Sequence, residues 1–195
     1  MPATVDNNNK TTAKTITYIS LLRGINVSGH NKLKMDALKK MYEKFGFKKV
    51  KTYLQSGNII FQNTDCNHNK LDQLISMQIK KDFELQVPVT VLTVDQMERI
   101  IKNNPFLKDL TKDISFLHVT FLASQPEDYD NESITSRIAK GEDIVITDSA
   151  VYLYCPDGYG KTKLTNSFIE SRLKVSATTR NWKSANEILR IAQEI

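Results

Sequence analysis

Residues 15–27 read TITYISLLRGINV, an apolar run that ends abruptly in arginine, glycine and asparagine. Its β-branched, aromatic and aliphatic side chains are typical of a buried β-strand. The polar end, Arg23-Gly24-Ile25-Asn26, would place a fixed positive charge and an amide at one edge of a sheet. The fold therefore depends on which later segments pair with this strand, and the chemistry depends on which of them reach the same edge.

The segments that follow alternate between helical and strand patterns. The elements that we expect in the first half are, in order, a strand at 15–27, a helix at 33–47, strands at 50–55 and 59–63, a helix at 69–83, a strand at 87–94 and a helix at 94–105. The second half repeats this order with a strand at 116–124, a helix at 132–142, strands at 142–148 and 150–157, a helix at 160–173, a strand at 175–179 and a helix at 184–195. The repeat lies in the order of the elements and not in residue identity.

Strand–helix–strand–strand–helix–strand is the element order of the ferredoxin-like fold. We therefore predict an α+β protein with two ferredoxin-like (βαββαβ) units in tandem. Its sheets should be mainly antiparallel, and one further helix should follow each unit. The predicted boundaries place a disordered tail at 1–14, the first unit at 15–105, and the second unit with its C-terminal helix at 106–195.

In this fold the end of the first strand and the turn of the following hairpin lie at the same edge of the sheet. The residues that would meet there, beside the start of the first helix, are Arg23, Gly24, Asn26, Ser56, Gly57 and Asn58. Glycine allows close backbone approach, a helix N-terminus offers free N–H groups, and arginine binds phosphate bidentately. One interpretation is a site for a small anionic ligand, either a phosphorylated metabolite or a nucleotide. The other is an ordinary turn in which Arg23 pairs with an acidic side chain.

A second polar motif, Thr178-Thr179-Arg180-Asn181-Trp182, falls between the last predicted strand and the last predicted helix. It contains the only tryptophan and repeats the arginine and asparagine of the first motif. Ser184 could cap the helix that follows. In one interpretation Arg180, Asn181 and Trp182 contribute a second anion site at a helix start. In the other, Trp182 packs in the core and Arg180 pairs with a carboxylate.

Composition bounds the class of protein. The chain has 195 residues, 40% of them hydrophobic and 25% charged, which is ordinary for a globular protein. It has no run of about 18 apolar residues, and its start lacks the apolar core of a signal peptide. We therefore expect no membrane span and a cytoplasmic location, where Cys66 and Cys155 would be free thiols.

The net charge of +5 permits nucleic-acid binding without requiring it. Lysines concentrate between Lys32 and Lys51, and they form either the solvated face of a helix or a phosphate-contacting stripe. An RNA-recognition domain shares the predicted element order. However, the first and third strands offer only Tyr18 and Phe61, and the aromatic signature of that domain is absent. Nucleic acid is therefore a weakly supported partner.

Motifs for catalysis and metal binding are scarce. Gly160-Lys161-Thr162 lacks the earlier glycine that a phosphate-binding P-loop needs, because Cys155 stands in its place. His30, His68 and His118 show no metal-ligand spacing, and His118 is expected to be a packed histidine in a strand. We therefore predict neither a metal nor a cofactor.

The two motif regions together resemble a known family. TYISLLRGINVSGHNKLKMDAL, KVKTYLQSGNIIF and TTRNW are similar to segments of the bacterial family called domain of unknown function 1697. The resemblance runs from about Ile16 to Ile191, and Ser184 stands where the family often has threonine. It implies a two-lobed α+β fold of ferredoxin-like units and no established activity. The residues that carry the resemblance are Arg23, Gly24, Asn26, Ser56, Gly57, Asn58, Thr179, Arg180, Asn181 and Trp182.

The sequence leaves four functions open. The first hypothesis is a binding protein with a small anionic ligand at the motif edge. The runner-up is a structural or protein-interaction role, in which the motif residues hold the two halves of the chain together. The third is an enzyme on a phosphorylated substrate that uses Tyr53, Asp36 or His30, and the fourth is a weak nucleic-acid binder. The oligomeric state is not predicted.

Overall fold

A computed structural model describes residues 14–27, 29–64 and 70–195 of the chain. The predicted tail, apart from Lys14, lies outside these residues, as do Cys66 and His68. The elements of the first half are β1 (Ile16–Leu22), α1 (Met35–Lys44), β2 (Lys48–Tyr53), β3 (Asn58–Asn63), α2 (Leu71–Phe83), β4 (Val89–Thr93) and α3 (Val94–Lys102). Two short 3₁₀ helices, η2 (Pro105–Lys108) and η3 (Ile114–Phe116), follow.

The second half contains β5 (Leu117–Leu122), α4 (Asn131–Thr135), β6 (Asp143–Ile146), β7 (Ala150–Tyr154), α5 (Asn166–Leu173), β8 (Ala177–Asn181) and α6 (Trp182–Gln193). The strands form two four-stranded sheets, ordered β2-β3-β1-β4 and β6-β7-β5-β8. All neighbours in both sheets are antiparallel. The predicted α+β fold of two tandem ferredoxin-like units is therefore confirmed.

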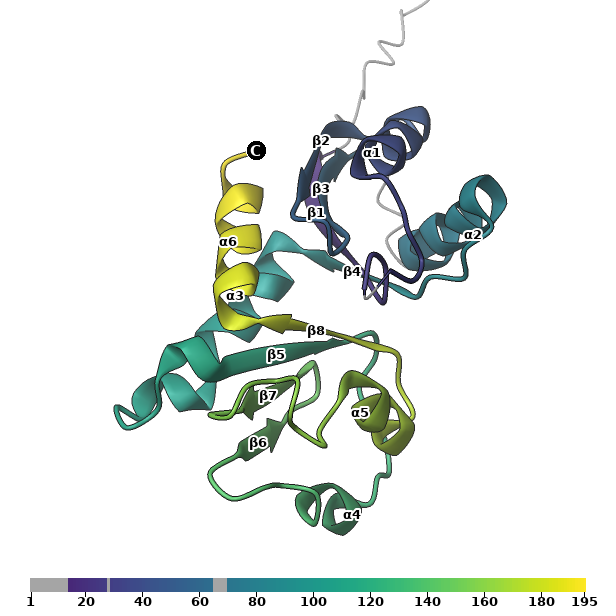
Figure 1. Cartoon of the computed structure of the whole chain (residues 1–195). Helices are drawn as coiled ribbons and strands as arrows, with labels where there is room; N and C mark the ends of the chain where they lie inside the picture. Colours follow the sequence, from purple (N-terminus) through teal and green to yellow (C-terminus); the bar gives the residue numbers. More distant parts are fainter. Residues whose placement is uncertain (1–13, 28, 65–69) are drawn as a thin grey trace, which may run out of the picture.

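Each sheet carries its own two helices on one face, and the other faces of the two sheets are turned toward each other (Figure 1). Because side chains alternate along a strand, each sheet divides its apolar residues between two cores. In β1, for example, Leu22 packs on the α1 and α2 side, whereas Ile19 and Leu21 belong to a core between the sheets. That central core also takes Val119 and Phe121 from β5, so it is shared by both units.

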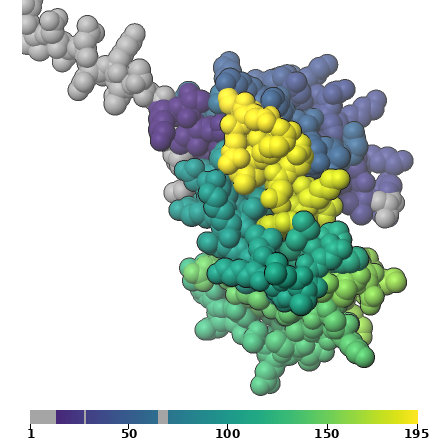
Figure 2. Space-filling view, turned by 90° about the vertical axis from the view of Figure 1, so that its left-hand side faces the viewer, coloured from purple at the N-terminus to yellow at the C-terminus, as the bar shows by residue number. Residues whose placement is uncertain are grey.

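The further helices α3 and α6, one after each unit, fill the central layer. They contact each other, and α6 contacts β1 and β3 of the first sheet as well as β5 and β8 of the second. In Figure 2 the yellow α6 lies between the blue first unit and the teal and green second unit. The C-terminal helix therefore joins the two halves of the chain.

Tyr18 and Phe61, the aromatic residues considered for RNA stacking, lie on the helix-covered face of the first sheet. They are fully buried, and their ring centroids are 5.5 Å apart. The opposite face of that sheet is covered by α3 and α6. RNA-recognition domains stack bases on an open sheet face, and the first sheet leaves neither of its faces open in this way.

Several element boundaries differ from the predicted ones. β1 ends at Leu22, not near Val27, because Gly24 and Asn26 adopt left-handed backbone conformations with φ of 69° and 53° that cannot continue a strand. α4 ends at Thr135, where the Thr135 hydroxyl donates back to the Asn131 carbonyl. Such a bond competes with helical pairing.

The start of α5 and the junction of β8 with α6 also differ. α5 begins at Asn166 instead of Gly160, because Thr165 caps it by accepting from the Phe168 N–H at 3.2 Å. β8 continues through Asn181, so the second motif lies inside a strand and at the first residue of a helix. The cap of α6 is Asn181, whose side chain accepts from the Ser184 N–H at 2.8 Å. The predicted cap, Ser184, is the donor of that bond.

Candidate functional site

The two segments of the first motif meet at one edge of the first sheet, as the element order predicts. The Leu22 N–H donates to the Gly57 carbonyl at 2.8 Å. Gly57 has φ of 74°, and a Cβ atom there would lie 2.7 Å from both Leu22 Cβ and Ile25 Cδ1. Only glycine fits this position, because both the backbone conformation and the close approach exclude a side chain.

Asn26 holds the loop after β1 in place. Its side-chain amide donates to the Leu33 carbonyl at 2.9 Å and to the Gln55 carbonyl at 2.7 Å, and its Oδ1 accepts from the Leu33 N–H at 2.8 Å. The Gly24 carbonyl accepts from the Asn31 side chain at 3.0 Å. The side chain of Asn26 and the carbonyl of Gly24 are therefore already hydrogen-bonded within the loop and to the neighbouring hairpin turn.

Asn58 is fully buried at the start of β3. Its amide nitrogen donates to the Tyr53 carbonyl at 2.9 Å and to Ser56 Oγ at 3.0 Å. Its Oδ1 accepts from Arg180 Nε at 2.6 Å. Because a buried amide without partners would be costly, this set of bonds fixes both the turn and the position of Arg180.

Arg180 crosses from β8 of the second unit to the motif edge of the first. Besides the bond to Asn58, one Nη atom donates to the Leu22 carbonyl at 2.8 Å and to the Ser56 carbonyl at 2.9 Å. The other donates to the Thr179 carbonyl at 2.9 Å. Burial lowers the pKa of Arg180 to about 10, so the guanidinium stays protonated at neutral pH. Within the described chain it forms no ion pair with a carboxylate.

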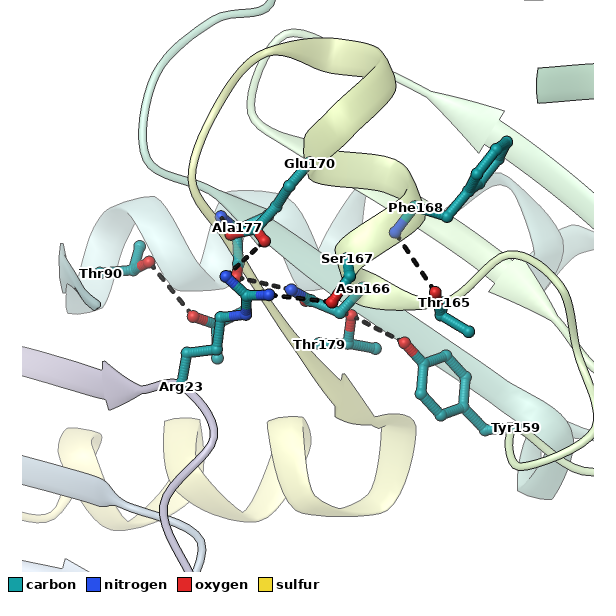
Figure 3. A network of polar contacts seen from close by, with 11 residues as sticks. Arg23, Thr90, Tyr159, Thr165, Asn166, Ser167, Phe168, Glu170, Ala177 and Thr179 are labelled. Carbon is teal, nitrogen blue, oxygen red and sulfur yellow. Dashed lines mark hydrogen bonds and ion pairs between the residues drawn. The ribbon is translucent and has the colours of Figure 1, made fainter. Parts of the chain in front are cut away.

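Arg23 crosses in the opposite direction, from the first unit to α5 of the second (Figure 3). It forms an ion pair with Glu170 and donates to Ser167 Oγ at 3.0 Å. Glu170 also accepts from the Ala177 N–H at 2.8 Å, which ties the pair to β8. Beside it, the hydroxyls of Thr90 in β4 and Thr178 in β8 lie 3.4 Å apart. The two units thus contact each other through polar groups from both sides.

We call this contact, formed by Arg23, Ser56, Gly57, Asn58 and Arg180, the inter-unit clamp. It unites the two motif regions of the sequence in one cluster. The remaining predicted site residues lie beside it: Asn26 and Gly24 in the loop, and Asn181 and Trp182 at the start of α6. Most donors of the clamp are engaged by protein acceptors, and the binding of a small anion at this edge stays a prediction.

A cleft that the sequence did not predict lies where α6, η3 and the start of β5 meet. It has a volume of about 1150 Å³, and Tyr53 contributes to it from the first unit. Its walls include Tyr53, Phe116, His118, Tyr159, Trp182 and Lys183, and we call it the aromatic cleft. The rings of His118 and Tyr159 stack with centroids 4.8 Å apart. His118 is thus packed against Tyr159 and half-buried, in line with the packed histidine that the sequence predicted, and it also forms part of the wall of the cleft.

A second, more polar cleft of about 560 Å³ opens between the end of β4 with α3 and the turn between β6 and β7. Its walls include Gln96, Arg99, Asp148 and Ser149. Neither cleft is lined by Arg23, Asn58 or Arg180.

The titratable groups considered for catalysis are dispersed. Tyr53 lines the aromatic cleft, Asp36 lies on α1, and His30 is exposed in the loop after β1. The carboxylate at the motif edge is Glu170, which is engaged by Arg23 and by the Ala177 N–H. Burial raises the pKa of the Cys155 thiol to about 11, so it is protonated at neutral pH.

The described residues contain neither a metal-type cluster nor a membrane-spanning helix. No cluster of three or more His, Cys, Asp or Glu side chains there has the geometry of a metal site. None of the helices described is both long enough and apolar enough to span a membrane.

The lysines between residues 32 and 51 are mostly exposed on α1, β2 and the loops beside them. One of them, Lys49, donates to the Ile195 carbonyl at 2.6 Å. The weakly supported nucleic-acid interaction stays a prediction.

Comparisons with known proteins give a family and a fold. The structure of conserved bacterial protein SP0830 from Streptococcus pneumoniae matches with a TM-score of 0.70 at 23% identity, covering 92% of this chain and 99% of that chain. No curated protein matches. The sequence model of the family described as "Protein of unknown function (DUF1697)" matches residues 16–152, which include the R-G-I-N and S-G-N motifs but not T-R-N-W. The chain therefore belongs to the DUF1697 family.

Proposed function

We propose that the R-G-I-N, S-G-N and T-R-N residues have a structural role, and that the chain is a rigid two-unit interaction protein. The observation that carries this proposal is the set of contacts made by Arg180. Three of its four hydrogen bonds cross from the second unit to acceptors of the first, namely Asn58 Oδ1 and the carbonyls of Leu22 and Ser56. A planar guanidinium suits this task, because it reaches several acceptors in a fixed geometry.

Loss of Arg180 should be costly because its partners are buried. Asn58 is fully buried, and replacement of Arg180 by alanine would leave its Oδ1 and two backbone carbonyls without this donor. A buried polar group left unsatisfied costs about 1–3 kcal/mol. We therefore expect Arg180→Ala to lower the free energy of unfolding by about 3–5 kcal/mol.

Urea unfolding of the full chain, followed by circular dichroism and by the emission of Trp182, measures this loss. Arg180→Lys keeps the positive charge but not the planar guanidinium, and it should lower the free energy of unfolding by about 2 kcal/mol. Arg99→Ala is the matched control, because Arg99 is exposed on α3, and it should change stability by less than about 0.5 kcal/mol. Inorganic phosphate or AMP should not restore the Arg180→Ala variant. A loss below about 1 kcal/mol would contradict the structural role.

A small anionic ligand at the same edge is the second candidate, and one observation favours it. Arg23 and Arg180 both lie at the contact between the units, and Glu170 is the one carboxylate in the described chain that pairs with either. An anion could compensate the remaining charge. Thermal-shift measurements with inorganic phosphate and with AMP test this candidate. A shift in the wild type that Arg23→Ala abolishes supports it, whereas equal shifts in both proteins exclude it. A cytoplasmic location remains part of both proposals.

A further inference from the structure

The aromatic cleft is large enough for a small molecule and has the lining of a small-molecule site. Its volume of about 1150 Å³ is somewhat larger than that of typical small-molecule sites, which run from about 300 to 1000 Å³. Flat rings from separate segments contribute to its walls: Tyr159 stacks on His118 on one side, and Trp182, which is mostly buried in the core between the sheets, borders the cleft from α6. Aromatic walls of this kind accept a planar ring by stacking.

Tyr159 is held firmly in this wall. Its hydroxyl donates to Thr179 Oγ1 at 3.3 Å, and the Thr179 hydroxyl in turn donates to Asn166 Oδ1 at 2.8 Å (Figure 3). Asn166 donates to the Ala177 carbonyl at 3.1 Å. Hydrogen bonds to β8 and to the start of α5 therefore fix Tyr159 in its stack on His118.

His118 offers an acceptor to a ligand. Its Nδ1 lies 3.2 Å from the Phe116 carbonyl, so this nitrogen carries the hydrogen of a neutral ring and donates it. Burial lowers the pKa of His118, which keeps the ring neutral at pH 7 and leaves the lone pair on Nε2. Among the described residues, none donates to Nε2, and none accepts from the Trp182 indole N–H.

The charged side chains of the cleft leave a positive excess. Two cations, Lys183 and Arg190, stand against one carboxylate, Glu187. Arg190 donates to Glu187 at 2.7 Å and also pairs with Glu194, so its charge is compensated. Lys183 is exposed and forms no direct ion pair within the described chain, although its charge lies near Glu187 and helps to lower the pKa of that carboxyl. A ligand with one negative charge would complement it.

We propose that the aromatic cleft binds a planar aromatic monoanion that also carries an N–H or O–H donor. The ring lies between the Tyr159–His118 stack and Trp182, the donor faces His118 Nε2, and the anionic group faces Lys183. This site is distinct from the inter-unit clamp and does not depend on the structural role of Arg180.

The probe for the test is 6-amino-2-naphthoate, which has a planar ring, one carboxylate and one amine. Because Trp182 is the only tryptophan, the quenching of its emission reports binding in the cleft directly. We expect saturable quenching of the wild type, with the dissociation constant confirmed by calorimetry. Two matched compounds, 2-naphthoate without the donor and 6-amino-2-naphthamide without the charge, should each bind at least fivefold more weakly.

Two variants assign the contacts. Lys183→Ala should weaken 6-amino-2-naphthoate at least fivefold and leave the uncharged amide within twofold. His118→Phe keeps a ring but removes the acceptor, so it should weaken the amino compound at least fivefold and leave 2-naphthoate within twofold. Lys80→Ala, an exposed lysine on α2, is the matched control and should change nothing.

Circular dichroism melting confirms that each variant is folded, and Lys183→Ala removes only an exposed side chain, so the test does not depend on the fate of His118→Phe. No saturable quenching of the wild type would overturn the proposal. Equal affinity of wild type and Lys183→Ala for all three compounds would also overturn it, because the anionic group would then not face Lys183.

Discussion

Arg180 and Trp182 stand two residues apart at the junction of β8 and α6, yet they belong to regions of opposite character. Arg180 donates three of its four side-chain hydrogen bonds to acceptors of the other unit and the fourth to the Thr179 carbonyl, so these donors already have protein partners. Trp182 borders a cleft in which, within the described chain, His118 Nε2 accepts no hydrogen bond and Lys183 forms no direct ion pair. The polar groups of Arg180 therefore hold the structure together, whereas those of the aromatic cleft are available to a ligand.

Gly57→Ala should destabilise the clamp nearly as much as Arg180→Ala. The new Cβ atom would lie 2.7 Å from Leu22 Cβ and from Ile25 Cδ1, in a backbone conformation with φ of 74°. Strain and overpacking together should lower the free energy of unfolding by about 3 kcal/mol, measured by urea titration.

Gly24→Ala is the control for this clash. Gly24 has a similar φ of 69°, but a Cβ atom there has nothing within 4 Å. Gly24→Ala should lower the free energy of unfolding by only about 1 kcal/mol, because it introduces backbone strain but no steric clash. Equal losses for the two variants would show that the close approach at Gly57 does not matter.

A double-mutant cycle on Arg180 and Asn58 should show the next largest effect. The two side chains share a bond of 2.6 Å across the units, and each has further bonds that the cycle subtracts. We expect a coupling energy of about 2 kcal/mol for Arg180→Ala combined with Asn58→Ala. A pair on separate sides, Arg180→Ala with Lys80→Ala, should be additive. If the losses of stability for Arg180→Ala and Asn58→Ala were additive, the bond between the two side chains would not contribute to the stability of the clamp.

The Arg23–Glu170 pair should contribute less than Arg180, although it also joins the units. The Arg23 side chain is 31% exposed and that of Glu170 15%, so water and salt screen the pair. We expect Arg23→Ala to cost about 1 kcal/mol in low salt, and less when sodium chloride is added. A loss as large as that of Arg180→Ala, or one that salt does not reduce, would show that the pair is not a screened surface contact.

The sequence was informative about the sheets and about the motif edge. Residues 15–27 read as a strand and Ser56-Gly57-Asn58 as a turn, and the ferredoxin-like order alone brings Leu22 and Gly57 to one edge. The close approach of the backbone at Gly57 follows from the same topology. These features depend on local patterns and on one known element order, which is why they can be predicted.

A contact in which the motif residues hold the two halves together was the second hypothesis from the sequence, but the bonding partners in that contact and the aromatic cleft could not be predicted from local patterns. Periodicity places Arg180 near a helix start, but it carries no information on how two sheets pack, and Asn58 lies 122 positions away along the chain. The cleft takes its walls from β2, η3, β5, the segment before α5, and α6. The single tryptophan was the one available signal, and one of its two interpretations is confirmed, because Trp182 is 7% exposed and packs in the core between the sheets.

The smallest expected effect is the pH dependence of stability that His118 causes in the wall of the cleft. Burial lowers the pKa of His118 in the folded protein below its value in the unfolded chain, which is about 6.5. Above that pH both states are neutral and the group contributes nothing. As the pH falls below about 6.5, the unfolded chain binds the proton more readily, so this group destabilises the folded protein. His118→Gln should therefore lose less stability than the wild type between about pH 8 and about pH 5 in urea titrations, with His30→Gln as the exposed control. If the wild type and His118→Gln lose stability in parallel, His118 is not desolvated in the cleft wall, and its Nε2 would be hydrated when the ligand arrives.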